Sequence, residues 1–86
     1  MDITVEVSYY PLRNDFKEPI KKLIDRLQQG NVDVLPGRIS TELFGTYEEV
    51  MKVINDAVRW SFEEYGHSVF VAKFLNGDRR PSTEPG

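Results

Sequence analysis

The sequence predicts an α+β fold of the ferredoxin-like type, a four-stranded antiparallel sheet with two helices on one face. Strand-like alternation opens the chain, a run rich in β-branched and aromatic residues lies near its end, and two amphipathic helical stretches lie between. The elements follow in the order β-α-β-β-α-β. Right-handed crossovers then place both helices on the same side of the sheet. The 86 residues suffice for one hydrophobic core. We therefore expect one domain over residues 1–76 and a polar C-terminal tail over residues 77–86 that is disordered or docked on a partner.

The first strand is predicted by strict alternation. Ile3, Val5 and Val7 are separated by polar residues, so one face of the strand meets a core while the other does not. Pro11 cannot donate a hydrogen bond to a neighbouring strand, and we expect the strand to end there.

The first helix is predicted from apolar residues at helical spacing between Phe16 and Leu27. Asn14 or Asp15 supplies a side chain suited to cap its N-terminus, and Gly30 is suited to its C-terminus.

A hairpin follows, with strands over residues 32–35 and 38–44 joined by a turn at Pro36 and Gly37. The second helix begins after Thr46, whose hydroxyl can accept from the Glu49 amide. Gly66 ends this helix, and residues 67–75 form the last strand. The apolar stripe of the second helix comprises Val50, Met51, Ile54, Ala57, Val58, Phe62 and Tyr65.

Composition and charge exclude several classes of function. The net charge of −3 argues against nucleic acid as a partner, and no apolar run is long enough for membrane insertion. There are no cysteines and one histidine, which argues against a metal site. No targeting signal precedes the first strand, so the expected location is cytoplasmic.

The last strand is apolar on both faces. Phe70, Ala72 and Phe74 share one face, and Val69 and Val71 lie on the other with Lys73 and Leu75. A face exposed to water would be more polar. We therefore expect the open sheet face to pack on a second copy, as a dimer or tetramer.

Enzyme chemistry is poorly supported. Serines are present without a nucleophile motif, and His67 is the one histidine available as a base. We expect no catalytic residue, no metal and no cofactor.

Polar residues on the predicted strands are the candidates for a binding site. Ser8, Ser40, Thr41 and Glu42 lie among apolar neighbours, and buried polar groups need partners. With nearby aromatic residues they could line a small-molecule pocket, or they could simply occupy solvated strand faces.

Four segments together resemble a known family: residues 8–12 (SYYPL), 37–45 (GRISTELFG), 48–50 (EEV) and 69–77 (VFVAKFLNG). Their order and spacing are similar to those of the YkoF-like thiamine/hydroxymethylpyrimidine-binding family, in the wider superfamily that includes small single-repeat members. The resemblance covers about residues 3–78.

This resemblance implies a ferredoxin-like fold, no catalysis and a homo-oligomer that binds thiamine or its hydroxymethylpyrimidine precursor for transport, salvage or sensing. On the segments shared with the family, the resemblance implies that Ser8, Ser40, Thr41 and Asn76 bind the ligand and that Tyr10 and Phe74 stack against it. Glu42 is added because its charge suits the thiazolium cation; it stands where relatives have an apolar residue. Because strand residues alternate, Ser40 and Thr41 cannot both line one face.

Two other functions stay open on the sequence. One is a structural or regulatory oligomer that binds another small ligand, such as an amino acid. The other is a small dimeric enzyme of the cofactor-free monooxygenase type, which would need Trp60 or His67 in a cavity.

Overall fold

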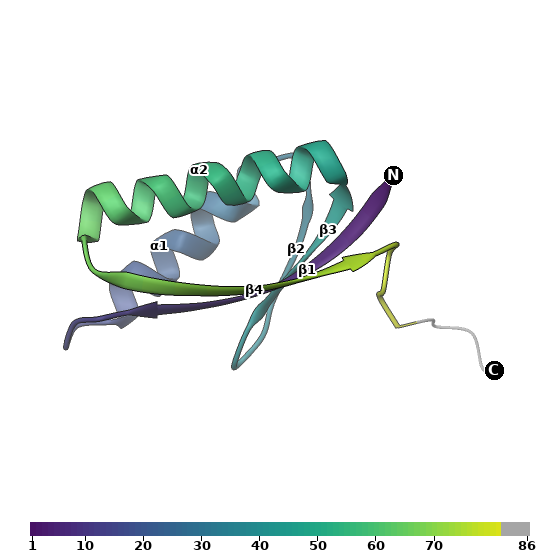
Figure 1. The fold of residues 1–86 in the computed structure, drawn as a ribbon. Coiled ribbons are helices and arrows are strands. Elements are labelled where there is room, and N and C mark those ends of the chain that lie inside the picture. The colour runs from purple at the N-terminus through teal and green to yellow at the C-terminus, as the bar shows by residue number, and fades with distance from the viewer. Residues whose placement is uncertain (82–86) are drawn as a thin grey trace.

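The computed structural model describes residues 1–81 and has the predicted βαββαβ order. The elements are β1 (Asp2–Pro11), α1 (Lys17–Gln28), β2 (Asp33–Pro36), β3 (Thr41–Thr46), α2 (Tyr47–Tyr65) and β4 (Ser68–Asn76). The strands form one antiparallel sheet in the order β2-β3-β1-β4. Both helices cover the same face of this sheet, and the other face carries no helix (Figure 1). The predicted fold class is confirmed.

The alternation in β1 divides the sheet into a helix face and an open face. Ile3, Val5 and Val7 are buried beneath the helices. Their neighbours in the register on β4 are Asn76, Phe74 and Ala72, which therefore share the helix face. The core is completed by Leu23 and Leu27 of α1, Leu43 of β3, and Val50, Val53 and Ala57 of α2.

The ends of α1 differ from the prediction. Its N-cap residue is Phe16, without a side-chain cap, so neither Asn14 nor Asp15 has the predicted role. The C-cap is Gln29. Gly30 is needed for another reason: a Cβ at this position would overlap the Val53 side chain of α2.

The start and end of α2 agree with the prediction. The Glu49 amide donates to Thr46 Oγ1 at 3.3 Å. Gly66 ends the helix with φ of 78°, in the left-handed region that favours glycine.

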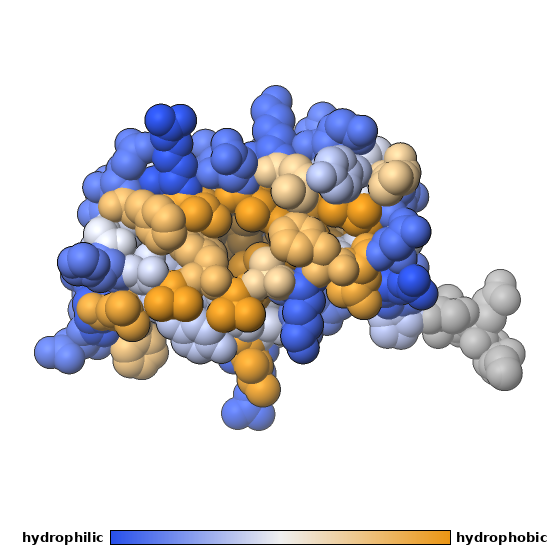
Figure 2. Space-filling model, viewed as in Figure 1, coloured by the Kyte–Doolittle hydropathy of each residue, from blue (hydrophilic) through white to orange (hydrophobic). Residues whose placement is uncertain are grey.

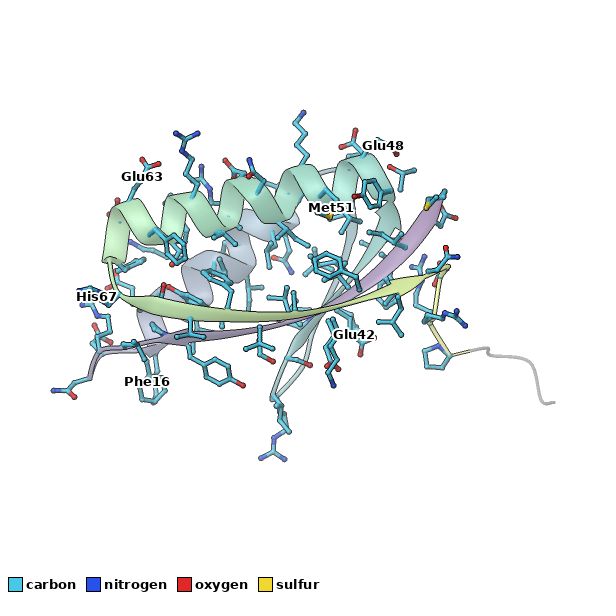
Figure 3. The ribbon with its side chains drawn as sticks, in the orientation of Figure 1. Phe16, Glu42, Glu48, Met51, Glu63 and His67 are labelled. Atoms are coloured by element: carbon cyan, nitrogen blue, oxygen red, sulfur yellow. The ribbon has the colours of Figure 1, made fainter. Side chains whose placement is uncertain are left out.

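The buried face of α2 is rotated from the predicted stripe. Its most buried residues are Val50, Val53, Ala57 and Ser61, whereas Phe62 is half exposed. Met51 lies to one side, above β4 (Figure 3). The helix thus has a second apolar side directed toward the β4 edge.

The hairpin is shorter than predicted, because β3 begins at Thr41 rather than at residue 38. The Gly37 amide donates to the Ser40 carbonyl at 2.9 Å and closes the turn. The tip of the hairpin extends below the sheet on the helix-free side (Figure 1).

Residues 77–80 pack on the open face of their own sheet. Thr4 Oγ1 donates to the Gly77 carbonyl at 2.9 Å and accepts from the Arg79 amide at 2.8 Å. The Arg80 guanidinium lies 4.7 Å from the Phe44 ring centroid and pairs with Asp33 at 2.8 Å. The part of the predicted tail over residues 82–86 lies outside the described residues.

Candidate functional site

The open face of the sheet combines polar and apolar side chains. The strand register places together Thr4, Glu6, Ser8 and Tyr10 of β1, Asp33 and Leu35 of β2, Glu42 and Phe44 of β3, and Val69, Val71, Lys73 and Leu75 of β4. The predicted faces of β1 and β4 are therefore confirmed.

A cavity of about 400 Å³ lies on this open face. Its lining consists of Glu6, Ser8, Tyr10, Ile39, Ser40, Val71 and Lys73. Strands β1 and β4 supply five of these residues, and the turn between β2 and β3 supplies Ile39 and Ser40. Residues from three parts of the chain therefore meet at one place.

The cavity has more negative than positive charge around it. Lys73 Nζ lies 3.6 Å from a Glu6 carboxylate oxygen. Glu42 is directly opposite Glu6 in the β1–β3 register, so its carboxylate lies on the same face (Figure 3). Two adjacent carboxylates repel one another, and a single amine leaves one of them uncompensated. This arrangement favours a bound cation.

The rest of the lining supplies aromatic and hydroxyl groups. Tyr10 is 49% exposed, so its ring is accessible to a ligand. Ser8 and Ser40 each offer one hydroxyl donor and acceptor. An aromatic surface, two hydroxyls and a cation-favouring carboxylate pair are suited to a small heteroaromatic cation.

Three of the seven predicted binding residues line this cavity, and a fourth lies beside it. Ser8, Tyr10 and Ser40 line the cavity, and Glu42 lies next to it on the same face. Their role in binding stays a prediction.

The other three predicted residues lie on the opposite face, so the seven do not form one pocket. Thr41 pairs with Val7 on the helix face and is buried. Phe74 and Asn76 also face the helices, because they pair with Val5 and Ile3. The physical reason is the period of two along each strand.

Phe74 and Asn76 instead line a second, more apolar cavity of about 380 Å³ at the N-terminal end of α2. Its other residues are Met1, Ile3, Tyr47, Met51 and Leu75. Apolar side chains form a hollowed band between α2 and β4 (Figure 2).

Sequence reasoning missed four residues that line the open-face cavity: Glu6, Ile39, Val71 and Lys73. The alternation already assigns Glu6 and Lys73 to the open face. Their proximity depends on the β1–β4 register, which pairs them directly. Ile39 belongs to the turn rather than to a strand, so periodicity does not place it.

The residues suggested for an enzyme lie elsewhere. Trp60 packs against the core on the helix layer, with the Arg26 guanidinium 5.3 Å from its ring centroid. His67 is exposed at the turn between α2 and β4 (Figure 3). Within residues 1–81, no group of three acidic or histidine side chains is arranged to hold a metal ion, and neither helix is long and apolar enough to cross a membrane.

No protein family profile matches the sequence, and no curated protein matches it. Solved structures do match. A protein from Streptococcus pneumoniae has a TM-score of 0.83 at 21% identity, over 92% of this chain and 90% of that one. A "putative thiamine biosynthesis/salvage protein" from Thermotoga maritima has a TM-score of 0.81 at 19% identity, over 90% of this chain and 85% of that one.

A domain of unknown function from Bacillus cereus, DUF77, has a TM-score of 0.75 at 22% identity. The match covers all of this chain and 83% of the DUF77 chain. These likenesses extend over nearly the whole chain in each case, and they show that it has the same ferredoxin-like α+β fold as these proteins.

Proposed function

We propose that this chain is a non-enzymatic binding protein for thiamine or its hydroxymethylpyrimidine precursor, acting in transport, salvage or sensing as a homo-oligomer. The observation that carries the proposal is the open-face cavity, in which an aromatic ring and two hydroxyls adjoin a pair of carboxylates. The thiamine-related name of the Thermotoga maritima neighbour supports the same ligand class.

The chemistry of thiamine fits this cavity in two parts. Its thiazolium ring carries a positive charge, which the Glu6 and Glu42 carboxylates attract and the Tyr10 ring can stack against. Its aminopyrimidine ring presents donors and acceptors that the Ser8 and Ser40 hydroxyls can match.

Titration calorimetry with thiamine and with hydroxymethylpyrimidine tests this proposal. Glu42→Gln should weaken thiamine binding by about tenfold, because a charge-assisted contact contributes roughly 1.5 kcal/mol or more. The same variant should change binding of the uncharged pyrimidine much less. Ser8→Ala should weaken both ligands.

The control is Glu48→Gln, the same substitution on α2 at the other side of the molecule (Figure 3). It should leave both affinities unchanged. If neither ligand binds the wild-type protein, or if Glu48→Gln weakens binding as much as Glu42→Gln, the proposal is wrong.

A second candidate is binding of an amino acid. Glu6 and Lys73 place one carboxylate and one amine in the same cavity, and this pair could match the ammonium and carboxylate of a zwitterion. A thermal-shift panel that includes amino acids separates the two candidates. A ligand at about 100 times its dissociation constant should add about 2.7 kcal/mol of stability.

A further inference from the structure

The outer edge of β4 has no partner strand within residues 1–81. Strand β4 is at the end of the sheet and pairs with β1 alone. The Gly77 amide donates to the Asp2 carbonyl, and the Leu12 amide donates to the His67 carbonyl. Hydrogen-bonded pairs alternate along an antiparallel ladder. It follows that the backbone N–H and C=O groups of the odd-numbered residues of β4 form hydrogen bonds with β1. The backbone groups that point outward from the sheet edge are therefore those of Ser68, Phe70, Ala72, Phe74 and Asn76.

The two edges of the sheet are protected very differently. At the opposite edge, β2 has four residues, of which Asp33 is charged and Pro36 has no N–H. Strand β4 has nine residues, no proline and one charge, Lys73. A long apolar edge of this kind is a template for pairing with another strand.

Exposed apolar side chains flank the β4 edge on both faces. Val69, Val71 and Leu75 are exposed on the open face, and Phe74 is exposed on the helix face. Phe62 of α2 adds to the helix side, where its ring lies 5.8 Å from that of Phe70. The hollowed apolar band between α2 and β4 ends at this edge (Figure 2). A strand added at this edge, with its own side chains on both faces, would cover the exposed apolar side chains on both faces of the sheet at once.

The sequence of β4 is suited to pairing with itself. An antiparallel pair with its two-fold axis at Ala72 matches all nine residues from Ser68 to Asn76. Phe70 then lies opposite the partner's Phe74. A pair centred on Lys73 would instead oppose two like charges, which is destabilising.

We propose that two copies of this chain join through their β4 edges, antiparallel about an axis at Ala72, to form one continuous eight-stranded sheet. The inference rests on the geometry of β4 and not on the identity of the ligand. Lys73 of each copy then lies opposite the partner's Val71, and both of these positions line the open-face cavity. The partner's Lys73 therefore lies at the β4 side of the cavity rim, with strands β1 and β4 between it and Glu42 of β3.

The open face is the less suitable surface for contact between copies. The hairpin tip extends below it (Figure 1), and Ile39 at this tip is 86% exposed. Two such faces packed together would also bring the Glu6 and Glu42 carboxylates of both copies close. We therefore assign the contact to the edge, and leave the open face to the ligand.

Sedimentation of variants over a dilution series tests the assignment. Phe74 and Leu35 are a matched pair, 54% and 53% exposed, one at the β4 edge and one on the open face of β2. Phe74→Lys should convert the dimer to a monomer, whereas Leu35→Lys should leave it dimeric. Ala72→Pro should also give a monomer, because it removes an outward N–H without touching the β1 ladder. Circular dichroism checks that each variant is folded.

Cysteine cross-linking tests the register. The chain contains no cysteine, so Ala72→Cys introduces a single thiol. With the axis at this residue, the two Cα atoms lie about 5.5 Å apart, within disulfide range, and mild oxidation should give a covalent dimer. Lys73→Cys should cross-link poorly, because its two copies are diagonal and about 7–8 Å apart.

The proposal is wrong if the wild-type protein is a monomer, or if Leu35→Lys alone dissociates the dimer. It is also wrong if Lys73→Cys cross-links and Ala72→Cys does not. Loss of thiamine binding alone bears on the proposed function and leaves this result unchanged.

Discussion

At the residue scale, one partly buried pair of hydroxyls joins the sheet to α2. Ser61 is fully buried, and its Oγ lies 2.6 Å from the Tyr9 hydroxyl. The Tyr9 ring stacks on Phe70 with centroids 4.6 Å apart. A buried polar group without a partner destabilises the fold, so each hydroxyl requires the other. The pair explains why a serine occupies the buried side of α2.

Ser61→Ala should lower the free energy of unfolding by about 1–2 kcal/mol, because it leaves the Tyr9 hydroxyl without its partner. Urea unfolding measures the effect. In the double variant with Tyr9→Phe the two losses should not add, since both remove the same bond. Ser68→Ala, at a more exposed hydroxyl, is the control and should change stability by less than about 0.5 kcal/mol. Additive losses in the double variant would contradict a shared hydrogen bond.

Gly30 shows a close approach between the chain after α1 and α2. A Cβ here would overlap Val53, so Gly30→Ala should destabilise the protein by about 1–3 kcal/mol. Placed in a Val53→Ala background, the same substitution should have a clearly smaller effect, because the obstructing methyl group is gone. Thermal unfolding of the four proteins in this cycle tests the claim, and an equal loss in both backgrounds would reject it.

At the element scale, the two helices are joined by an ion pair beside an aromatic ring. Arg26 Nε of α1 donates to Asp56 Oδ2 of α2 at 2.8 Å, and its guanidinium lies over the Trp60 ring. The hydrogen bond from Arg26 lowers the pKa of Asp56 below its usual value of about 3.8. The pair therefore contributes to the packing of α1 on α2.

The direction of this shift predicts an acid dependence of stability. Because the pKa of Asp56 is lower in the folded than in the unfolded state, its ionised carboxylate stabilises the fold at pH values above its usual pKa. This stabilisation is lost as the pH falls through the pKa of the folded state. Asp56→Asn should flatten the decline in stability between about pH 5 and pH 2. Urea unfolding at each pH measures this slope. Equal slopes for wild type and Asp56→Asn would count against the pair.

At the scale of the whole molecule, residues 77–80 return to the open face and pack at one end of the sheet. Arg80 covers Phe44 and pairs with Asp78 and Asp33. The hydrogen bonds of Asp78 and then Asp33 raise the pKa of Arg80 above its usual value. The core of this contact is Thr4, which is buried and bonds to Gly77 and Arg79.

Thr4→Val should release this segment, because the valine side chain can neither donate to Gly77 nor accept from Arg79. Trypsin cleavage after Arg79 should then be faster than in the wild type. Thr4→Ser retains the hydroxyl and should keep the wild-type rate. If Thr4→Val is cleaved no faster than Thr4→Ser, the two hydrogen bonds do not hold the segment in place.

The sequence alone determined the features that depend on neighbouring residues. The division of β1 and β4 into two faces, the presence of two helices, the Thr46 cap and the Gly66 helix end follow from local patterns, and each is confirmed. The order of these elements then sufficed for the fold class, because few connections between them are physically allowed.

Only the tertiary structure decided which distant residues meet. Alternation predicts that Ser40 and Thr41 face opposite ways, but the structure decides that Ser40 is the one that lines the open-face cavity. The register likewise brings Glu6 between Glu42 and Lys73. Likewise, Tyr9 meets Ser61 because of how α2 is rotated over the sheet. Register and helix rotation depend on packing between segments far apart in the chain, and a periodic pattern within one segment carries no information about its partner.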